Sequence, residues 1–267
     1  MKIVVLLTVA LPMLGALACL IVPGRGVQTA SHVTAWATTV AAMSVAMAAL
    51  ANPSGRIVGR LVLVDATSGV FVAVIAAVGL VSALVSPAYL VTTARSVFVA
   101  RHAARGYYAT FHVFWALLLA IPMVGNLGSA WLLIEATTAA SALLVASSGR
   151  RSALEAGWKY LILTTLGLTI SLLGIVVVFV AATPQGGSFA TLDWRNLPGV
   201  VAGVDRQTAI VALALIITGL AAKIGWAPVH HWLPDAHSEA PPPVSALLSA
   251  ALLPTVIYVA WRVKDVF

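Results

Sequence analysis

Long apolar stretches separated by short polar connections run through the whole chain. A helix needs about 20 mostly apolar residues to cross the hydrocarbon core of a bilayer. On this spacing the sequence predicts eight transmembrane helices, and the polar stretch at 183–206 is expected to be an exposed loop lying partly on the membrane surface. The expected spans are 3–23, 30–50, 66–90, 108–124, 127–146, 158–182, 208–227 and 243–261.

The composition supports the same architecture. Of the 267 residues 61% are hydrophobic and only 9% are charged, whereas soluble domains carry roughly 25% charged residues. The alternating strands and aromatic girdles typical of membrane barrels are absent. The predicted fold class is therefore an all-α membrane protein, with residues 1–267 forming a single transmembrane domain.

Basic residues give the net charge of +7 and lie mainly between the apolar stretches. This distribution predicts membrane orientation rather than nucleic-acid binding, because connections rich in Lys and Arg stay in the cytoplasm. The connections between spans three and four and between spans five and six are expected to be cytoplasmic, with the N-terminus outside. Arg262 and Lys264 fall on the opposite side and argue against this orientation. The basic residues that favour it are Arg95, Arg101, Arg105, Arg150 and Arg151.

Glu135 lies near the middle of the apolar stretch Gly128–Val145. A charge at the centre of a bilayer costs about 2.5–3.5 kcal/mol on insertion scales. One interpretation is a neutral carboxyl group that hydrogen-bonds a neighbouring helix as a structural contact. The other is a protonatable relay site, because burial brings carboxyl groups closer to titration at neutral pH.

Lys223 ends the apolar stretch that begins near Thr208. It is either an interfacial lysine that reaches the water at the far face or a relay residue. Pro228 and Pro234 follow it and predict a break in the seventh helix near Pro228. Broken helices at membrane depth line cavities or ion paths, which favours the relay interpretation.

Further ionisable residues flank these two. Lys159 follows Glu155 at helical i,i+4 spacing, so it is either a surface pair or a charge that modulates Glu135. His230 and His237 are predicted to belong to a proton path, because histidine titrates near pH 7. A metal site is less favoured, since the adjacent His230 and His231 point to different helix faces and a fourth ligand at suitable spacing is missing.

His112, in the fourth span, is a secondary candidate and is otherwise expected to be a lone polar contact. Motifs for nucleotide or cluster binding are not found in the sequence. We therefore expect no cofactor and no metal, with energy supplied by an ion gradient or a partner subunit.

Three motifs resemble one known family. They are K-I-G-W-A-P-V-H-H-W-L-P-D-A-H-S-E-A-P-P-P-V-S-A-L-L at Lys223–Leu248, N-L-G-S-A-W-L-L-I-E-A-T-T-A-A-S-A-L-L-V at Asn126–Val145, and E-A-G-W-K-Y-L-I-L at Glu155–Leu163. They are similar to motifs of the antiporter-like membrane subunits of respiratory complex I, membrane-bound hydrogenases and Mrp sodium/proton antiporters. The resemblance is closest to the hydrogenase-4 or formate hydrogenlyase F-type subunit.

The resemblance implies roles for individual residues. It implies that Glu135 and Lys223 form the carboxylate–lysine pair of a half-channel, that Lys159 is an accessory base, and that the family histidine falls on His230 and His237. The seventh helix would be broken around Pro228, with about 107–267 as the first antiporter-like repeat and helices one to three peripheral.

Two departures from the family pattern stand out. Relatives usually have about fourteen helices, and this chain resembles a version shortened to the N-terminal half. Some relatives also carry a basic residue in helix eight, where this chain has Ser249 and Pro254.

The function expected from this resemblance is proton translocation through a buried Glu–Lys relay. The chain would be a multi-pass subunit in the inner (cytoplasmic) membrane, within a redox-driven ion translocase of the NADH-quinone oxidoreductase or membrane-bound hydrogenase kind. It would not be catalytic alone, and its partners would be other membrane subunits, lipid and protons, or sodium ions. The alternatives are a non-conducting structural subunit of such a complex and a sodium/proton antiporter subunit.

Overall fold

The computed structural model describes residues 1–24, 26–59, 61–93, 97–183 and 187–267. Side chains are described for these residues except in the range 91–103. Within these residues, eight helical segments are long and apolar enough to cross a membrane, which confirms the predicted fold class. Seven lie in α1 (Lys2–Ile21), α2 (Gly26–Ala51), α3 (Ala66–Thr93), α4 (Val97–Ala120), α5 (Leu127–Val145), α6 (Arg151–Ala182) and α8 (Arg206–Ile224). The eighth comprises α10 (Pro242–Leu247), the π-helical turn η4 (Leu248–Leu252) and α11 (Leu253–Val266).

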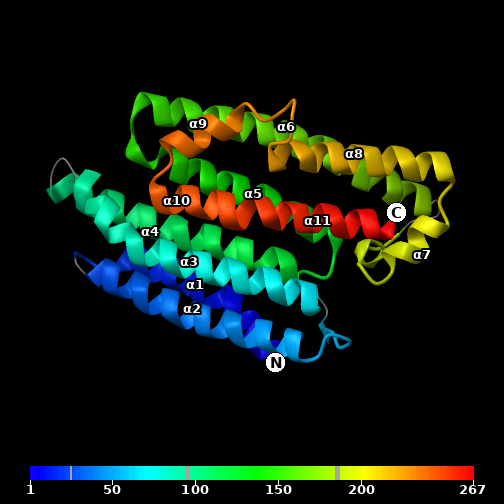
Figure 1. Ribbon diagram of the computed structural model, residues 1–267, viewed down its shortest axis with the longest axis horizontal. Helices are drawn as coiled ribbons and strands as arrows, with labels where there is room; N and C mark the ends of the chain where they lie inside the picture. The colour runs from blue at the N-terminus through cyan, green and yellow to red at the C-terminus, as the bar shows by residue number, and fades with distance from the viewer. Residues whose placement is uncertain (25, 60, 94–96, 184–186) are drawn as a thin grey trace.

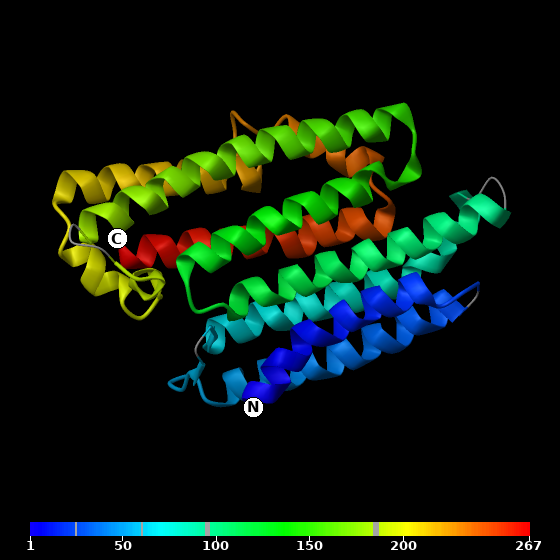
Figure 2. The ribbon, with the colours of Figure 1, turned by 180° about the vertical axis from the view of Figure 1, so that it is seen from behind.

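The long helices run side by side along the longest axis of the molecule (Figures 1 and 2). The blue helices α1 and α2 lie at one edge of the bundle, α6 and α8 lie at the other, and α5, α10 and α11 lie between them. The α1, α3 and α5 helices end at one end of the bundle, whereas both chain termini lie toward the other. This alternation agrees with a chain that crosses a membrane back and forth.

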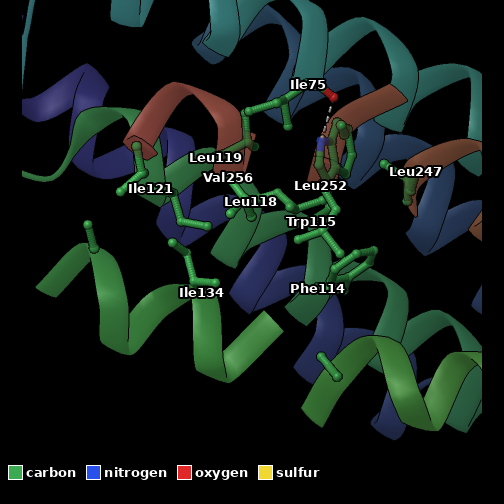
Figure 3. Close-up of a cluster of buried hydrophobic side chains, with 14 of the residues drawn as sticks. Ile75, Phe114, Trp115, Leu118, Leu119, Ile121, Ile134, Leu247, Leu252 and Val256 are labelled. Carbon is green, nitrogen blue, oxygen red and sulfur yellow. Dashed lines mark hydrogen bonds between the residues drawn. The ribbon is translucent and has the colours of Figure 1, made fainter. Parts of the chain in front are cut away.

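Large apolar side chains fill the centre of the bundle (Figure 3). Trp115 of α4 is fully buried, and its indole Nε1 donates a hydrogen bond to the carbonyl oxygen of Ile75 in α3 at 3.1 Å. This bond satisfies the one polar atom of a large apolar ring, which makes tryptophan tolerable in a core. Other core residues come from α4, α5, α10, η4 and α11: Phe114, Leu118, Ile134, Leu247, Leu252 and Val256.

The outer faces of the bundle are also apolar. Leucines on α1 and α6 leave half or more of their surface exposed, which would be costly over so large an area in water. The same faces fit the acyl chains of a bilayer. The exposed leucines include Leu14, Leu17, Leu166 and Leu173.

The α6 and α8 helices pack with their backbones in direct contact along a glycine seam formed by Gly167, Gly174 and Gly219. A Cβ atom on Gly219 would overlap the carbonyl oxygen of Gly167, and one on Gly174 would lie 2.6 Å from the carbonyl oxygen of Ala212. Small residues allow such close approach of membrane helices, which compensates for the lack of a hydrophobic driving force in lipid.

The helix expected to break does so next to the buried lysine. α8 ends at Ile224, and Gly225 has φ +81°, a left-handed conformation that favours glycine. The chain is non-helical until α9 (Trp232–Glu239) begins, so Pro228 lies in the break as predicted. Pro234, the second proline predicted at the break, lies in the first turn of α9, where a proline does not interrupt helical hydrogen bonds.

Further boundaries differ from the expectation. α4 begins at Val97 rather than near 108. α6 begins at Arg151 rather than near 158, since the polar residues that precede its apolar stretch continue the same helix. The 183–206 connection is not a simple exposed loop: it contains η3 (Phe189–Leu192) and α7 (Leu197–Ala202). Trp194 is buried there and donates to the carbonyl oxygen of Val124 at 3.2 Å. Gly186, also predicted to be in this loop, lies outside the described residues.

A polar cluster joins the last helix to the start of α3. The Arg262 guanidinium donates to the Asp65 carboxylate and to the Tyr258 hydroxyl, and Tyr258 donates to the carbonyl oxygen of Pro122 at 3.2 Å. Burial opposes ionisation of Asp65, but hydrogen bonds from Ser68 and the charge of Arg262 outweigh it, so the pKa of Asp65 lies below its ordinary value. The Arg262 charge that argued against the predicted orientation is therefore compensated within the fold. The orientation of the chain in the membrane remains a prediction. Of the arginines that favour it, Arg95 and the side chain of Arg101 lie outside the described part of the structure.

Candidate functional site

Lys223 lies in the last turn of α8 and is completely buried. Its ammonium Nζ donates to the Thr138 hydroxyl of α5 at 2.7 Å and to the Tyr160 hydroxyl of α6 at 2.6 Å. The nitrogen also lies 4.5 Å from the centroid of the Tyr160 ring, a cation–π distance. These contacts disfavour the interfacial interpretation, because the side chain points into the bundle and is completely buried there.

A layer of hydroxyl groups and one indole ring surround the lysine. The Tyr160 hydroxyl lies 2.7 Å from Ser141 Oγ on α5. The buried Trp232 of α9 packs against the Tyr160 ring at 4.8 Å between centroids and donates to the carbonyl oxygen of Ala222 at 2.9 Å. The last turn of α8 also favours a cation, since helix C-termini carry partial negative charge. Lys223 is therefore held by α5, α6 and α8, and α9 closes the layer behind Tyr160.

Glu135 lies three residues before Thr138, on the same side of α5. Its carboxylate Oε1 accepts a hydrogen bond from the Thr165 hydroxyl of α6 at 2.7 Å. The other oxygen, Oε2, is buried without a hydrogen-bond partner in the described part of the chain. Glu135 thus contacts α6 at Thr165, whereas Lys223 of α8 reaches the same two helices at Thr138 and Tyr160. Among the described side chains, Glu135 and Lys223 form no direct ion pair.

Lys159 lies outside this buried layer. It forms ion pairs with Glu155 at 2.7 Å and with Asp235 of α9 at 3.2 Å, and about half of its side chain is exposed (49%). The surface pair expected from its spacing is present. The contact with Asp235 additionally ties α6 to the helix that follows the break.

The histidines of the same region are spread over separate contacts. His230 and His231 are exposed in the non-helical break, and their rings stack with centroids 4.9 Å apart. His237 of α9 is half-buried, with its Nδ1 2.9 Å from the Ser245 hydroxyl of α10. The structure does not bring these histidines into contact with Lys223 or Glu135. Over the described residues, no three side chains of metal-ligand type converge.

His112 of α4 lies in a different part of the bundle. It is fully buried, with Nε2 2.9 Å from the Ser31 hydroxyl of α2 and Nδ1 without a partner in the described part of the chain. It is a polar contact between two helices, as one of the two expectations for it stated, and it does not contact the lysine site.

Sequence reasoning missed the hydroxyl groups that contact the two ionisable residues. Thr138 follows Glu135 by three residues, the spacing of one helical face, so its position carried a usable signal. Tyr160 and Thr165 came from another helix, and only the packing of α6 on α5 brings them near. Ser141 was hidden among the small residues of α5 for the same reason.

A helix that breaks beside a buried lysine, inside a bundle of apolar helices, is a feature of membrane transport proteins. The fold and the site define an antiporter-like transmembrane protein. Residues 124–267 match the family described as NADH:quinone oxidoreductase/Mrp antiporter, transmembrane, and the chain belongs to this family.

Individual relatives agree with this family. The chain is 32% identical over 210 residues to a hydrogenase-4 component F homolog of Methylacidiphilum infernorum, covering 77% of this chain and 44% of that protein. It is 32% identical over 157 residues to NADH-quinone oxidoreductase subunit N of Desulforudis audaxviator, covering 59% of this chain and 30% of the relative. The chain thus matches less than half the length of these relatives.

Solved structures share the fold. A chain of the membrane-bound sulfane sulfur reductase, an archaeal respiratory membrane complex, matches with a TM-score of 0.82 at 21% identity, covering 99% of this chain and 53% of that one. A chain of the Mrp complex from Dietzia sp. matches with 0.77 at 22% identity, covering 99% and 49%. A chain of respiratory complex I from Thermus thermophilus matches with 0.69 at 22% identity, covering 95% and 52%. The family resemblance expected from the sequence motifs is confirmed.

Proposed function

We propose that this chain is a proton-translocating subunit of a respiratory or hydrogenase-type membrane complex, located in the inner (cytoplasmic) membrane. Lys223 carries the proton, and Glu135 sets the charge next to it. The observation that carries the proposal is the complete burial of Lys223 among hydroxyl groups instead of carboxylates. A carboxylate contact would hold the lysine charged, whereas hydroxyl groups accommodate both its charged and its neutral form.

Glu135 supports the same proposal through its position. Its carboxylate Oε2 is buried without a partner in the described part of the chain, and Thr138, three residues later on the same helix, contacts Lys223. A conformational or redox event in a partner subunit that alters the separation of Glu135 and Lys223 would then move the proton onward.

Ionisable residues near the break are proposed to connect this pair with water. His230 lies in the break that follows Lys223, and Lys159 is held next to α9 by Asp235. His237 is half-buried between α9 and α10. In this proposal the three side chains exchange protons with the solvent and pass them toward the buried lysine.

The decisive measurement is proton uptake into inverted membrane vesicles. The vesicles come from a strain that lacks the native chain and expresses each variant within the assembled complex. Lys223→Ala and Glu135→Gln are each expected to lower the uptake rate about tenfold or more, because each removes a protonatable group from the buried layer. The matched controls are Lys264→Ala and Asp265→Asn, which alter an exposed ion pair far from the site. Uptake that stays at the wild-type rate in both site variants would contradict the proposal.

The same vesicles distinguish the alternatives. A sodium/proton antiporter subunit would give uptake that depends on sodium ions. A structural, non-conducting subunit would give normal transport in both variants and a disassembled complex when the whole chain is deleted. Copurification in mild detergent, with subunits identified by mass spectrometry, reports assembly for every variant.

A further inference from the structure

The hydrogen-bond directions around Lys223 are fixed when the lysine is charged. An ammonium group only donates, so the hydroxyl oxygens of Thr138 and Tyr160 both accept from it. The single hydroxyl proton of Tyr160 must then point elsewhere, and Ser141 Oγ lies 2.7 Å away to accept it. Ser141 in turn donates to the carbonyl oxygen of Thr137 at 2.5 Å. The chain of donors therefore runs from lysine to tyrosine to serine to the backbone.

When the lysine is neutral, only one hydrogen bond around it has to change direction. Its amine nitrogen has a lone pair that requires a donor, because an unpaired polar atom is costly to bury. The Thr138 hydroxyl directs its proton toward the carbonyl oxygen of Ile134 at 3.3 Å and still accepts from the amine. Tyr160, at 2.6 Å from Nζ, is the group placed to supply the donor. Ser141 keeps its bond to the backbone in both states.

We propose that Tyr160 is a positioning residue for Lys223 whose hydroxyl reverses its donor direction whenever the lysine gains or loses its proton. The hydroxyl donates to Ser141 beside the charged lysine and to Nζ beside the neutral one. Tyr160 keeps its own proton throughout, so the step is a rotation about its C–O bond. The transported proton leaves or reaches Lys223 along the path, and this inference rests on the proposed function.

The surroundings of Tyr160 suit such a rotation. Trp232 packs against the ring with the two centroids 4.8 Å apart, so the ring is held while the hydroxyl remains free to turn. The groups at this layer are Glu135, Thr138 and Ser141 on α5, Lys223 on α8 and Trp232 on α9, and of these Glu135 and Lys223 are ionisable. A reversible hydroxyl lets the lysine exist in either charge state without a direct carboxylate contact.

The first test is Tyr160→Phe in the assembled complex, measured as proton uptake into vesicles. Phenylalanine keeps the ring and its contact with Trp232, and removes only the hydroxyl. We expect assembly at the wild-type level and an uptake rate lowered about tenfold, because one charge state of the lysine loses its partner. The matched control is Tyr107→Phe, which removes a buried hydroxyl bonded to Ser86 at 2.9 Å and leaves the site intact. The control is expected to pump as the wild type does.

The second test replaces Tyr160 with 3-fluorotyrosine by codon suppression. Fluorine makes the hydroxyl a better donor and a poorer acceptor at nearly unchanged size, which favours the neutral lysine. The pH dependence of uptake is expected to move to lower pH, and fluorotyrosine at position 107 is expected to leave it unchanged. A purely structural tyrosine would give no shift at either position.

The outcomes separate the two proposals. Normal uptake in Tyr160→Phe, or an unshifted pH dependence with fluorotyrosine, overturns the role of Tyr160 if Lys223→Ala has abolished transport. Normal uptake in Lys223→Ala overturns the proposed function itself. If Tyr160→Phe fails to assemble, the fluorotyrosine variant decides.

Discussion

Two largely buried cations in this chain are stabilised in opposite ways. Arg262 donates to the Asp65 carboxylate, whereas Lys223 donates to hydroxyl groups alone. A guanidinium is charged at every accessible pH, so pairing it with a carboxylate gives a fixed structural contact. A lysine is able to lose its proton, and its hydroxyl partners serve both of its states. The difference in partners separates a structural cation from a functional one.

The structural contact leads to a prediction about stability and pH. Because the pKa of Asp65 is lower in the folded chain than in the unfolded one, the pair contributes stability above the unfolded value of about 4 and loses it as pH falls through the folded value. Asp65→Asn is expected to lower the unfolding free energy by about 1–3 kcal/mol at pH 7. Thermal unfolding in detergent at pH 7 and at lower pH measures this, and the difference from wild type should shrink at the lower pH. Asp265→Asn, in an exposed pair, serves as the control and should change little.

At the scale of single residues, the sequence was informative where a side chain was anomalous. Glu135 and Lys223 stood out because charges are rare in apolar stretches. Thr138, Tyr160 and Thr165 did not stand out, since hydroxyl residues in membrane helices often bond their own backbone, as Thr164 does to the carbonyl oxygen of Tyr160. Whether a hydroxyl serves its own helix or a neighbour depends on how the helices are rotated against each other.

At the scale of elements, the apolar pattern predicted the helices well because a bilayer imposes a fixed minimum length. The start of α6 was missed, since hydropathy marks the part of a helix in lipid and not its polar extension. The seam between α6 and α8 was missed as well. Glycines in an apolar stretch do not reveal which neighbour they face, and two separate helices must be packed before the contact appears.

Gly219→Ala tests the glycine seam. Its added Cβ would overlap the Gly167 backbone, so α8 must move away from α6, and Lys223 one turn later must move away from Tyr160. We expect lower thermal stability of the purified protein and a proton uptake rate reduced severalfold. Gly199→Ala on α7 is the matched control, because nothing lies within 4 Å of its added Cβ. Equal melting temperatures for the two variants would argue against a tight seam.

At the scale of the whole molecule, the charges predict which side of the membrane each end faces. Ser152, at the start of α6, and Ser188, next to η3, are exposed and belong to connections at opposite ends of the bundle. Ser152→Cys is expected to react with a membrane-impermeant maleimide from the cytoplasmic side, and Ser188→Cys from the outside. Both are introduced after Cys19, the one native cysteine, has been replaced by alanine. Labelling of Ser152→Cys in intact cells would reverse the predicted orientation.

The glycine seam has a mechanical consequence for the whole bundle. Because their backbones are in contact, α6 and α8 are expected to move as one rigid body that carries both Lys223 and Tyr160. A tilt of this rigid body against α5 would lengthen the hydrogen bond from Lys223 to Thr138. The hydrogen bond from Lys223 to Tyr160 would stay intact. Lys223 and Tyr160 would then move together, away from the helix that carries Glu135. A subunit pressing on α5 would thereby act on the proton without touching the residue that holds it.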